Sequence, residues 1–115
     1  MGEPPIEDVK GRLDELAAEL AAADPRVSIG RPGRTRGFGA NGLTVAGSIF
    51  AMVVQGRLVV KIDRQRVDEL VAAGAGEPLE TSTGKRMKEW VSVGPLDDAA
   101  FRALVLEAHR FVGGP

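Results

Sequence analysis

Basic residues are concentrated in the middle of this chain, and their distribution is the sequence feature with the clearest chemical meaning. Residues 25–66 hold eight bases and one acid, a net charge of +7, whereas residues 1–24 carry −5 and residues 67–115 carry −3. The total charge of −1 therefore hides a cationic segment between two acidic ones. Such a segment is expected to bind an anionic partner or to be neutralised by its flanks. Its bases are Arg26, Arg31, Arg34, Arg36, Arg57, Lys61, Arg64 and Arg66.

Two sets of candidate contact residues follow from the positions of the bases. The first set lies partly on a glycine-rich loop and partly on a predicted strand, where positions four apart share a face. The second set alternates along a later strand and includes the only tryptophan of the chain. Arginine suits phosphate because its planar guanidinium donates hydrogen bonds as a fork. The candidate contact residues are Arg31, Arg34, Arg36, Arg57 and Lys61 in the first set, and Arg86, Lys88 and Trp90 in the second.

The same bases have a purely structural interpretation, in which the acidic first helix neutralises them. Glu7, Asp14, Glu15 and Glu19 are available for such pairs. An isoelectric point near 5.8 is also unfavourable for an autonomous DNA-binding protein. We favour charge balance, and nucleic-acid binding by residues 26–66 is the alternative.

A glycine motif of the form G-x-G-x-x-G occupies residues 37–42. A dinucleotide site needs a strand before this motif and a helix after it, so that the helix N-terminus faces the pyrophosphate. Here an Arg-Pro-Gly-Arg-Thr run precedes the motif and a β-type run follows it. We therefore expect the glycines to let the backbone turn into a hairpin strand, and we predict no cofactor.

Residue types that usually carry catalysis are sparse. The chain has no cysteine and one histidine, His109, which lies beside the apolar stripe of the last predicted helix. A metal site would therefore need carboxylates alone, and adjacent acids such as Asp97 and Asp98 diverge on a helix. No motif gives a serine a histidine–acid partner. We predict no catalytic residues, no metal site and a protein that is not an enzyme.

The periodicity predicts an α+β domain in which three helices pack on an antiparallel sheet. Short breaks at Gly47 and Gly56 suit tight hairpin turns, so the strands around them form a three-stranded meander. Asp63 and Asp97 are placed to cap the helices that follow them. The predicted elements are a helix over 4–23, a basic glycine-rich loop over 26–42, a β-meander over 43–62, a helix over 64–73, a strand region over 78–93 and a helix over 97–112.

Side-chain periodicity also assigns faces to two of these elements. Alternation along the last strand places Met87 and Val91 on one face and Trp90 on the other. The apolar stripe of the last helix extends to Phe111 and Val112.

Length and composition are those of one globular domain, with 115 residues of which 43% are hydrophobic. No apolar run approaches the ~20 residues that a membrane span needs, and the acidic start lacks an apolar signal core. We expect a cytoplasmic protein with no membrane partner.

Three stretches with distinctive order and spacing carry a family resemblance: residues 36–43, 47–51 and 56–63, followed by Ala72-Ala73-Gly74. They read Arg-Gly-Phe-Gly-Ala-Asn-Gly-Leu, Gly-Ser-Ile-Phe-Ala and Gly-Arg-Leu-Val-Val-Lys-Ile-Asp. The pattern resembles the N-terminal domain of the TfoX/Sxy competence-regulator family, a relative of the MmcQ/YjbR-like fold. The resemblance covers about residues 30 to 112. It implies an antiparallel sheet with helices and a regulatory or nucleic-acid-linked role, as in adaptors that work with the cyclic AMP receptor protein at promoters.

These observations lead to a first hypothesis of a non-enzymatic interaction domain that acts through protein contacts. Its candidate surface is the hairpin over residues 47–62 with the arginine-rich loop before it. The alternative is a weak nucleic-acid binder, and a third hypothesis is a small-ligand or catalytic protein that uses residues 38–41. The question of a homodimer formed through sheet edges is left open, because the sequence carries no specific sign of one.

Overall fold

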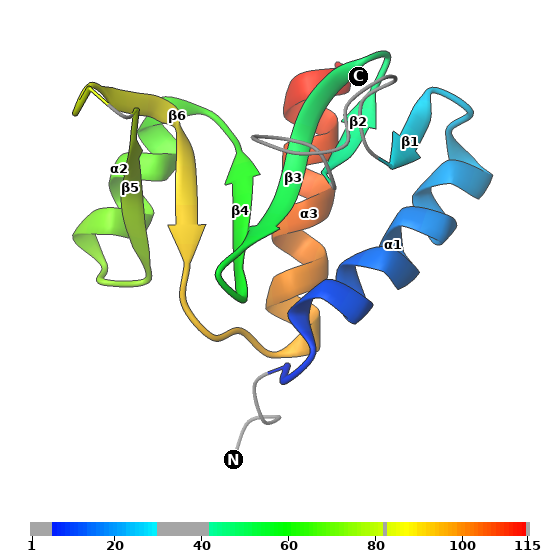
Figure 1. The fold of residues 1–115 in the computed structure, drawn as a ribbon, viewed down its shortest axis with the longest axis horizontal. Helices are drawn as coiled ribbons and strands as arrows, with labels where there is room; N and C mark the ends of the chain where they lie inside the picture. The colour runs from blue at the N-terminus through cyan, green and yellow to red at the C-terminus, as the bar shows by residue number, and fades with distance from the viewer. Residues whose placement is uncertain (1–5, 30–41, 82, 115) are drawn as a thin grey trace.

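A six-stranded sheet forms the middle of the molecule, with the strand order β1-β2-β3-β4-β6-β5 (Figure 1). The structure, a computed structural model, describes residues 6–29, 42–81 and 83–114. Every neighbouring pair of strands is antiparallel, which confirms the predicted α+β class. The strands are β1 (Val27–Ile29), β2 (Leu43–Val45), β3 (Ser48–Val54), β4 (Arg57–Lys61), β5 (Gly76–Glu80) and β6 (Arg86–Val93). The helices of the described ranges are α1 (Val9–Ala23), α2 (Arg64–Ala72) and α3 (Asp98–Gly113).

The predicted meander is strands β2, β3 and β4, joined by two tight turns. Ala46 and Gly47 both have positive φ, 52° and 85°, and so do Gln55 and Gly56, 52° and 76°. Two consecutive residues of positive φ form the hairpin turn whose twist matches that of the flanking strands. A strand, β2, begins directly after Gly42, and residues 37–41 of the glycine motif lie outside the described residues.

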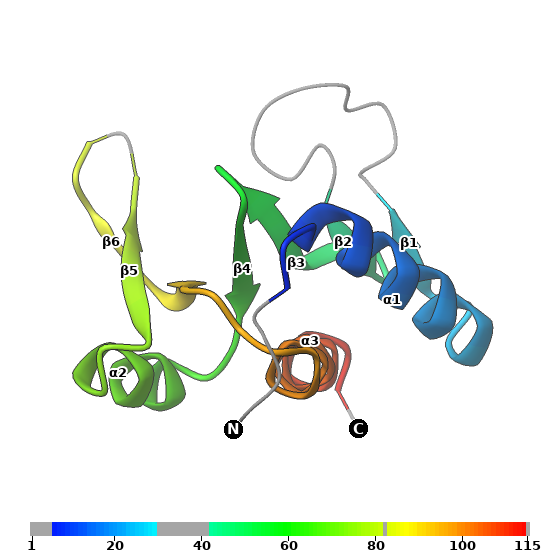
Figure 2. The same ribbon diagram turned by 90° about the horizontal axis from the view of Figure 1, so that it is seen from below.

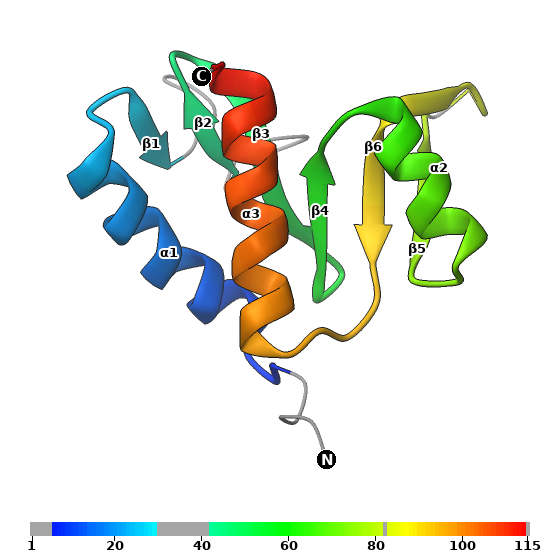
Figure 3. The same cartoon turned by 180° about the vertical axis from the view of Figure 1, so that it is seen from behind.

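All three helices contribute to the main core, on one face of the sheet. Figure 3 shows α3 lying across β3 and β4, with α1 to one side and α2 to the other. Seen from below, α2 and α3 lie on the same side of the sheet (Figure 2). The largest fully buried side chains include Phe50 of β3, Phe101 of α3 and Leu13 of α1. Burial of these apolar side chains is the main term that holds the layers together.

The predicted helix caps are present. Asp63 accepts a hydrogen bond from the Gln65 backbone N–H at 2.9 Å, and Asp97 accepts one from the Ala100 N–H at 2.9 Å. Each cap satisfies an N–H group that the first helical turn leaves without a partner. Gly74, with φ of 75°, follows the end of α2 as predicted.

Two predicted segments differ from the structure. The first helix begins at Val9 because the Asp8 carboxylate caps it by accepting from the Gly11 N–H at 2.9 Å. Ile6 lies before the helix, and its N–H donates to the Leu96 carbonyl at 2.8 Å. The segment predicted as an irregular loop over 26–42 begins with strand β1, which at three residues is too short to show alternation. The rest of that loop, residues 30–41, lies outside the described residues.

Two face assignments are also wrong. Met87 packs with Trp90, whereas Val91 belongs to the helix-side core. The reason is an irregularity in the pairing of β5 with β6, where the partner of Pro78 is Val91 but the partner of the next residue is Met87. A bulge of this kind breaks the alternation of faces. Phe111 is 38% exposed and so leaves the apolar stripe of α3, whereas Val112 is half-buried and packs against the main core as predicted.

Candidate functional site

A second, smaller apolar cluster lies on the face of the sheet opposite the main core. Val59 lies between Leu58 and Val60, which both face the main core, and successive strand residues point to opposite faces. Trp90 belongs to this second cluster and is only 7% exposed. Trp90 is therefore a core residue of this face rather than an exposed aromatic platform. The cluster consists of Ile49, Met52, Val59 and Trp90, with Leu79 and Met87 packed against it.

Five basic side chains line an open hollow beside this cluster. The hollow has a volume of about 510 Å³, and Met87, Glu89 and Trp90 complete its lining. The bases come from the end of β4, the start of α2, and the beginning of β6 with the turn before it. We call this surface the cationic hollow. Its bases are Lys61, Arg64, Lys85, Arg86 and Lys88.

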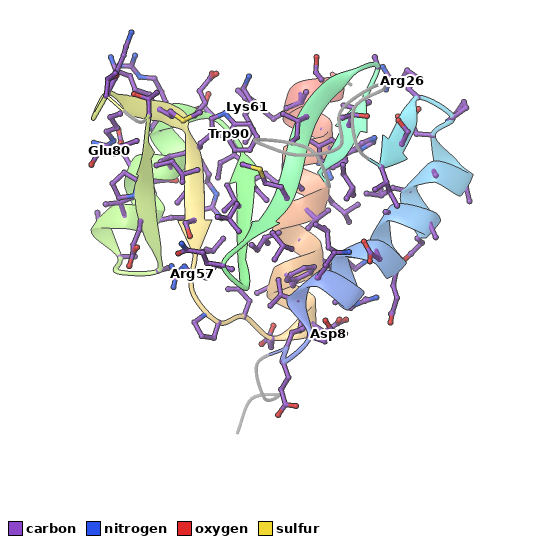
Figure 4. The ribbon with its side chains drawn as sticks, in the orientation of Figure 1. Asp8, Arg26, Arg57, Lys61, Glu80 and Trp90 are labelled. Atoms are coloured by element: carbon purple, nitrogen blue, oxygen red, sulfur yellow. The ribbon has the colours of Figure 1, made fainter. Side chains whose placement is uncertain are left out.

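Local backbone geometry explains why bases so far apart in sequence meet here. Lys61 is the register partner of Trp90, so pairing of β4 with β6 brings the two together (Figure 4). The Asp63 cap starts α2 directly after β4, which places Arg64 beside Lys61 in the hollow lining. In the hairpin turn, the Lys85 N–H donates to the Thr81 hydroxyl at 3.1 Å. The hollow is thus built from paired strands and a capped helix.

Two acids already contact bases of the cationic hollow. Glu89 approaches Lys61 with 4.0 Å between Oε1 and Nζ, and Asp68 accepts a hydrogen bond from Arg86 at 3.1 Å. A smaller hollow of about 140 Å³ adjoins it and is lined by Arg64, Asp68, Arg86 and Lys88. The other three bases, Arg64, Lys85 and Lys88, form no ion pair with any described residue. Across the two adjoining hollows, bases therefore outnumber acids by five to two.

Arg57, also predicted as a contact residue, lies away from this surface. It begins β4, whereas Lys61 ends it, and Figure 4 shows the two side chains at opposite ends of the strand. The Arg57 guanidinium donates to the Ser92 hydroxyl at 2.9 Å and to the Ser92 carbonyl at 3.3 Å. Arg57 thus ties β4 to β6.

The acids of the first helix do not neutralise the described bases of the cationic segment. Their partners are other bases: Asp14 pairs with Lys10, Glu15 with Arg12, and Glu19 with Arg102. In the cationic segment, Arg26 pairs with Asp24, just after the helix, and Arg66 pairs with Glu69 and Glu107. The first helix therefore does not supply the balancing acids, but Arg26, Lys61 and Arg66 are each paired with an acid of a flanking segment.

Ionic contacts between α1 and α3 perturb several carboxyl groups. The hydrogen bonds that Arg26 donates from its side chain and backbone hold the pKa of Asp24 well below its usual range, with a contribution from His109. The bond from Arg12 likewise lowers the pKa of Asp98. His109 lies 3.0 Å from Asp24 and packs edge-on against Phe50, with 5.5 Å between ring centroids. These groups join structural elements, and His109 is the partly covered histidine that its position beside the stripe indicates.

A metal site, a small-ligand pocket and a membrane span are the other features to consider in the part of the chain that the structure describes. No group of three or more His, Asp or Glu side chains there could hold a metal ion. A pocket of about 150 Å³ lies between residues 6–9, the β3–β4 turn and the segment before α3, and its lining is mainly apolar. None of the helices in the described ranges is both long and apolar enough to cross a bilayer.

Of the eight predicted contact residues, the structure brings four together: Lys61, Arg86, Lys88 and Trp90. Arg31, Arg34 and Arg36, like residues 38–41 of the third hypothesis, lie outside the described residues. Two members of the cationic hollow, Arg64 and Lys85, were not among the predicted contacts. The Asp63 cap could have indicated Arg64, because it fixes where α2 starts.

The fold and the spacing of the glycine and hairpin segments agree with one family of proteins. The family model for the TfoX N-terminal domain matches residues 28–109. No curated protein and no solved structure matches the chain. The matched range runs from β1 to α3 and includes the whole cationic hollow. The chain belongs to the TfoX N-terminal domain family.

Proposed function

We propose that this protein is a regulatory, non-enzymatic interaction domain whose cationic hollow binds an acidic segment of another protein. One observation carries the proposal: five bases from three elements line a single hollow in a chain of net charge −1. Three of them have no ion pair with a described residue. Clustered like charges repel one another, so they are expected to gain from an anionic partner.

The burial of Trp90 favours a protein over a nucleic acid as the partner. Proteins that bind single strands combine basic grooves with aromatic rings on which bases stack. Trp90 is 7% exposed and packs among aliphatic side chains, so it does not offer such a ring. The negative net charge also disfavours association with a long polyanion. Nucleic-acid binding by the same bases is the competing outcome of the test.

A regulatory rather than catalytic role agrees with how the titratable groups are used. The only histidine is bonded to Asp24 between two helices, away from the cationic hollow. Proteins that act by contact need a shaped, charged surface and no reacting group. A cytoplasmic location is part of the proposal and suits a chain without cysteine.

The direct test is fluorescence anisotropy with the purified domain and three labelled probes: a Glu-rich peptide, a double-stranded DNA and a single-stranded DNA. We expect the peptide to bind most tightly, with an affinity that falls as salt increases. Charge reversal by Lys88→Glu should abolish peptide binding. Arg110→Glu is the matched control, because Arg110 is also a base without an ion pair to a described residue but lies on α3.

Three results would overturn the proposal. The first is that the peptide fails to bind at low salt. The second is that DNA binds more tightly than the peptide. The third is that Lys88→Glu and Arg110→Glu reduce peptide binding equally. Circular dichroism of each variant distinguishes lost binding from lost folding.

A further inference from the structure

The cationic hollow and the smaller hollow beside it contain one carboxylate each, and these two acids bear on what a partner must offer. Asp68, on α2, bonds Arg86 at 3.1 Å, and Glu89, on β6, lies 4.0 Å from Lys61. Both acids are well exposed, at 65% and 46% of the side chain. In the smaller hollow, one carboxylate thus lies among three bases. The domain already holds carboxylate groups where a partner's carboxylates would bind.

We infer that Asp68 and Glu89 are internal competitors, and that an incoming acidic segment displaces them from Arg86 and Lys61. The inference rests on the proposed function. Exposed ion pairs contribute little to stability, because water solvates both partners well and the side chains lose freedom on pairing. Displacement therefore costs the folded domain little, while the two acids still lower the affinity of any other anion.

Competition of this kind selects for a partner with several carboxylates. Five bases against two acids leave a local excess of +3. A single carboxylate gains only one contact and meets the repulsion of Asp68 and Glu89. A segment with several acids engages Arg64, Lys85 and Lys88 at the same time, so each further contact forms at high effective concentration. The partner class is a segment with three or more closely spaced Asp or Glu residues.

The test compares the affinity of a labelled tetra-glutamate peptide for the full chain and four variants by anisotropy at low salt. Asp68→Asn and Glu89→Gln should each bind about two- to fivefold more tightly, the change expected from removing one exposed competing pair. Asp14→Asn is the remote control, because it opens an equally exposed pair with Lys10 on α1. Glu80→Gln is the local control, because Glu80 (labelled in Figure 4) is the register partner of Arg86 on β5 but has no ion pair with a described residue.

Each outcome has a defined meaning. Tighter binding by Asp68→Asn and Glu89→Gln alone supports competition. If Glu80→Gln or Asp14→Asn raises the affinity for the peptide equally, the competition is overturned. The gain would then come from the loss of any negative charge on the domain. Unchanged affinity in all four variants, with binding by the unaltered protein intact, overturns the competition but leaves the proposed function standing. Failure of the unaltered protein to bind overturns the proposed function itself. A mono-glutamate peptide that binds as tightly as the tetra-glutamate peptide would contradict the selection for several carboxylates.

Discussion

Asp24 and His109 connect the C-terminal parts of α1 and α3, with 3.0 Å between the carboxylate Oδ2 and the imidazole Nε2. Asp24 is the C-cap residue of α1, and Arg26, the residue before β1, donates to the same carboxylate. One side chain therefore fixes two helices and an edge strand. The pairs of Arg12 with Asp98 and of Glu19 with Arg102 add two further ionic contacts between the same helices.

Acid should weaken this connection. Because the folded-state pKa of Asp24 is depressed below its unfolded value, its ionised form stabilises the fold above about pH 4, and this contribution is lost as the pH falls further. The lowered pKa values of Asp98 and Glu19 act in the same direction. Asp24→Asn should lower the urea midpoint at pH 7 and make it less dependent on pH between 2 and 5. A variant with the same acid dependence as the unaltered protein would show that Asp24 titrates normally.

The second apolar cluster shows which face assignments follow from the sequence of a strand and which do not. Alternation holds in β4, where Val59 faces away from Leu58 and Val60. It failed at Met87, because one pairing irregularity between β5 and β6 cannot be read from the strand itself. Periodicity describes a strand, whereas register depends on the partner strand.

The cationic hollow was predicted only in part for a similar reason. The charge count placed Arg64 in the cationic segment and Lys85 in the acidic flank that follows it. The structure joins them through pairing of β4 with β6, a contact between segments about thirty residues apart in the chain. The net charge of a segment can be counted from the sequence, but the net charge of a surface depends on which segments the fold brings together. Local signals such as the Asp63 cap and the Gly47 and Gly56 turns were predicted because their causes are local.

The turn between β3 and β4 should tolerate a stabilising substitution. Gln55 has φ of 52°, a left-handed conformation that costs most side chains about 1 kcal/mol. Gln55→Asn creates the Asn-Gly pair favoured in this turn, so the free energy of unfolding should rise by about 0.5 kcal/mol. Gln55→Val should lower it, because a β-branched side chain suits this conformation least. Urea denaturation measures both, and a Val variant at least as stable as the Asn variant would contradict the turn geometry.

Trp90 should matter for stability and not for partner contact. Trp90→Ala removes most of a buried side chain and should cost about 3–5 kcal/mol of unfolding free energy. Trp90→Phe keeps most of the apolar volume and should leave the affinity for a Glu-rich peptide unchanged. Thermal denaturation and anisotropy on the same samples separate the two effects. A large loss of affinity in the folded Phe variant would show that the ring contacts the partner directly.

The cap of α2 gives the sharpest test of whether the backbone positions the cationic hollow. Asp63 both starts α2 and adds a negative charge next to Lys61 and Arg64. Asp63→Ser removes the charge but keeps a side chain that caps, whereas Asp63→Ala removes both and should cost about 1 kcal/mol of unfolding free energy. If only the charge of Asp63 matters, both variants should bind an acidic peptide more tightly than the unaltered protein does. Positioning predicts that Asp63→Ala binds more weakly than Asp63→Ser, because the first turn of α2 and Arg64 with it lose their fixed place.

A second cap controls for stability in this comparison. Asp97 caps α3 with the same 2.9 Å bond, so Asp97→Ala should cost a similar free energy without moving any base of the cationic hollow. Anisotropy and urea denaturation of the three variants give affinity and stability together. Equal affinities for Asp63→Ser and Asp63→Ala would show that charge, and not the start of α2, determines binding. A weaker Asp63→Ala beside an unaffected Asp97→Ala would show that this surface depends on one carboxylate holding one helical turn in place.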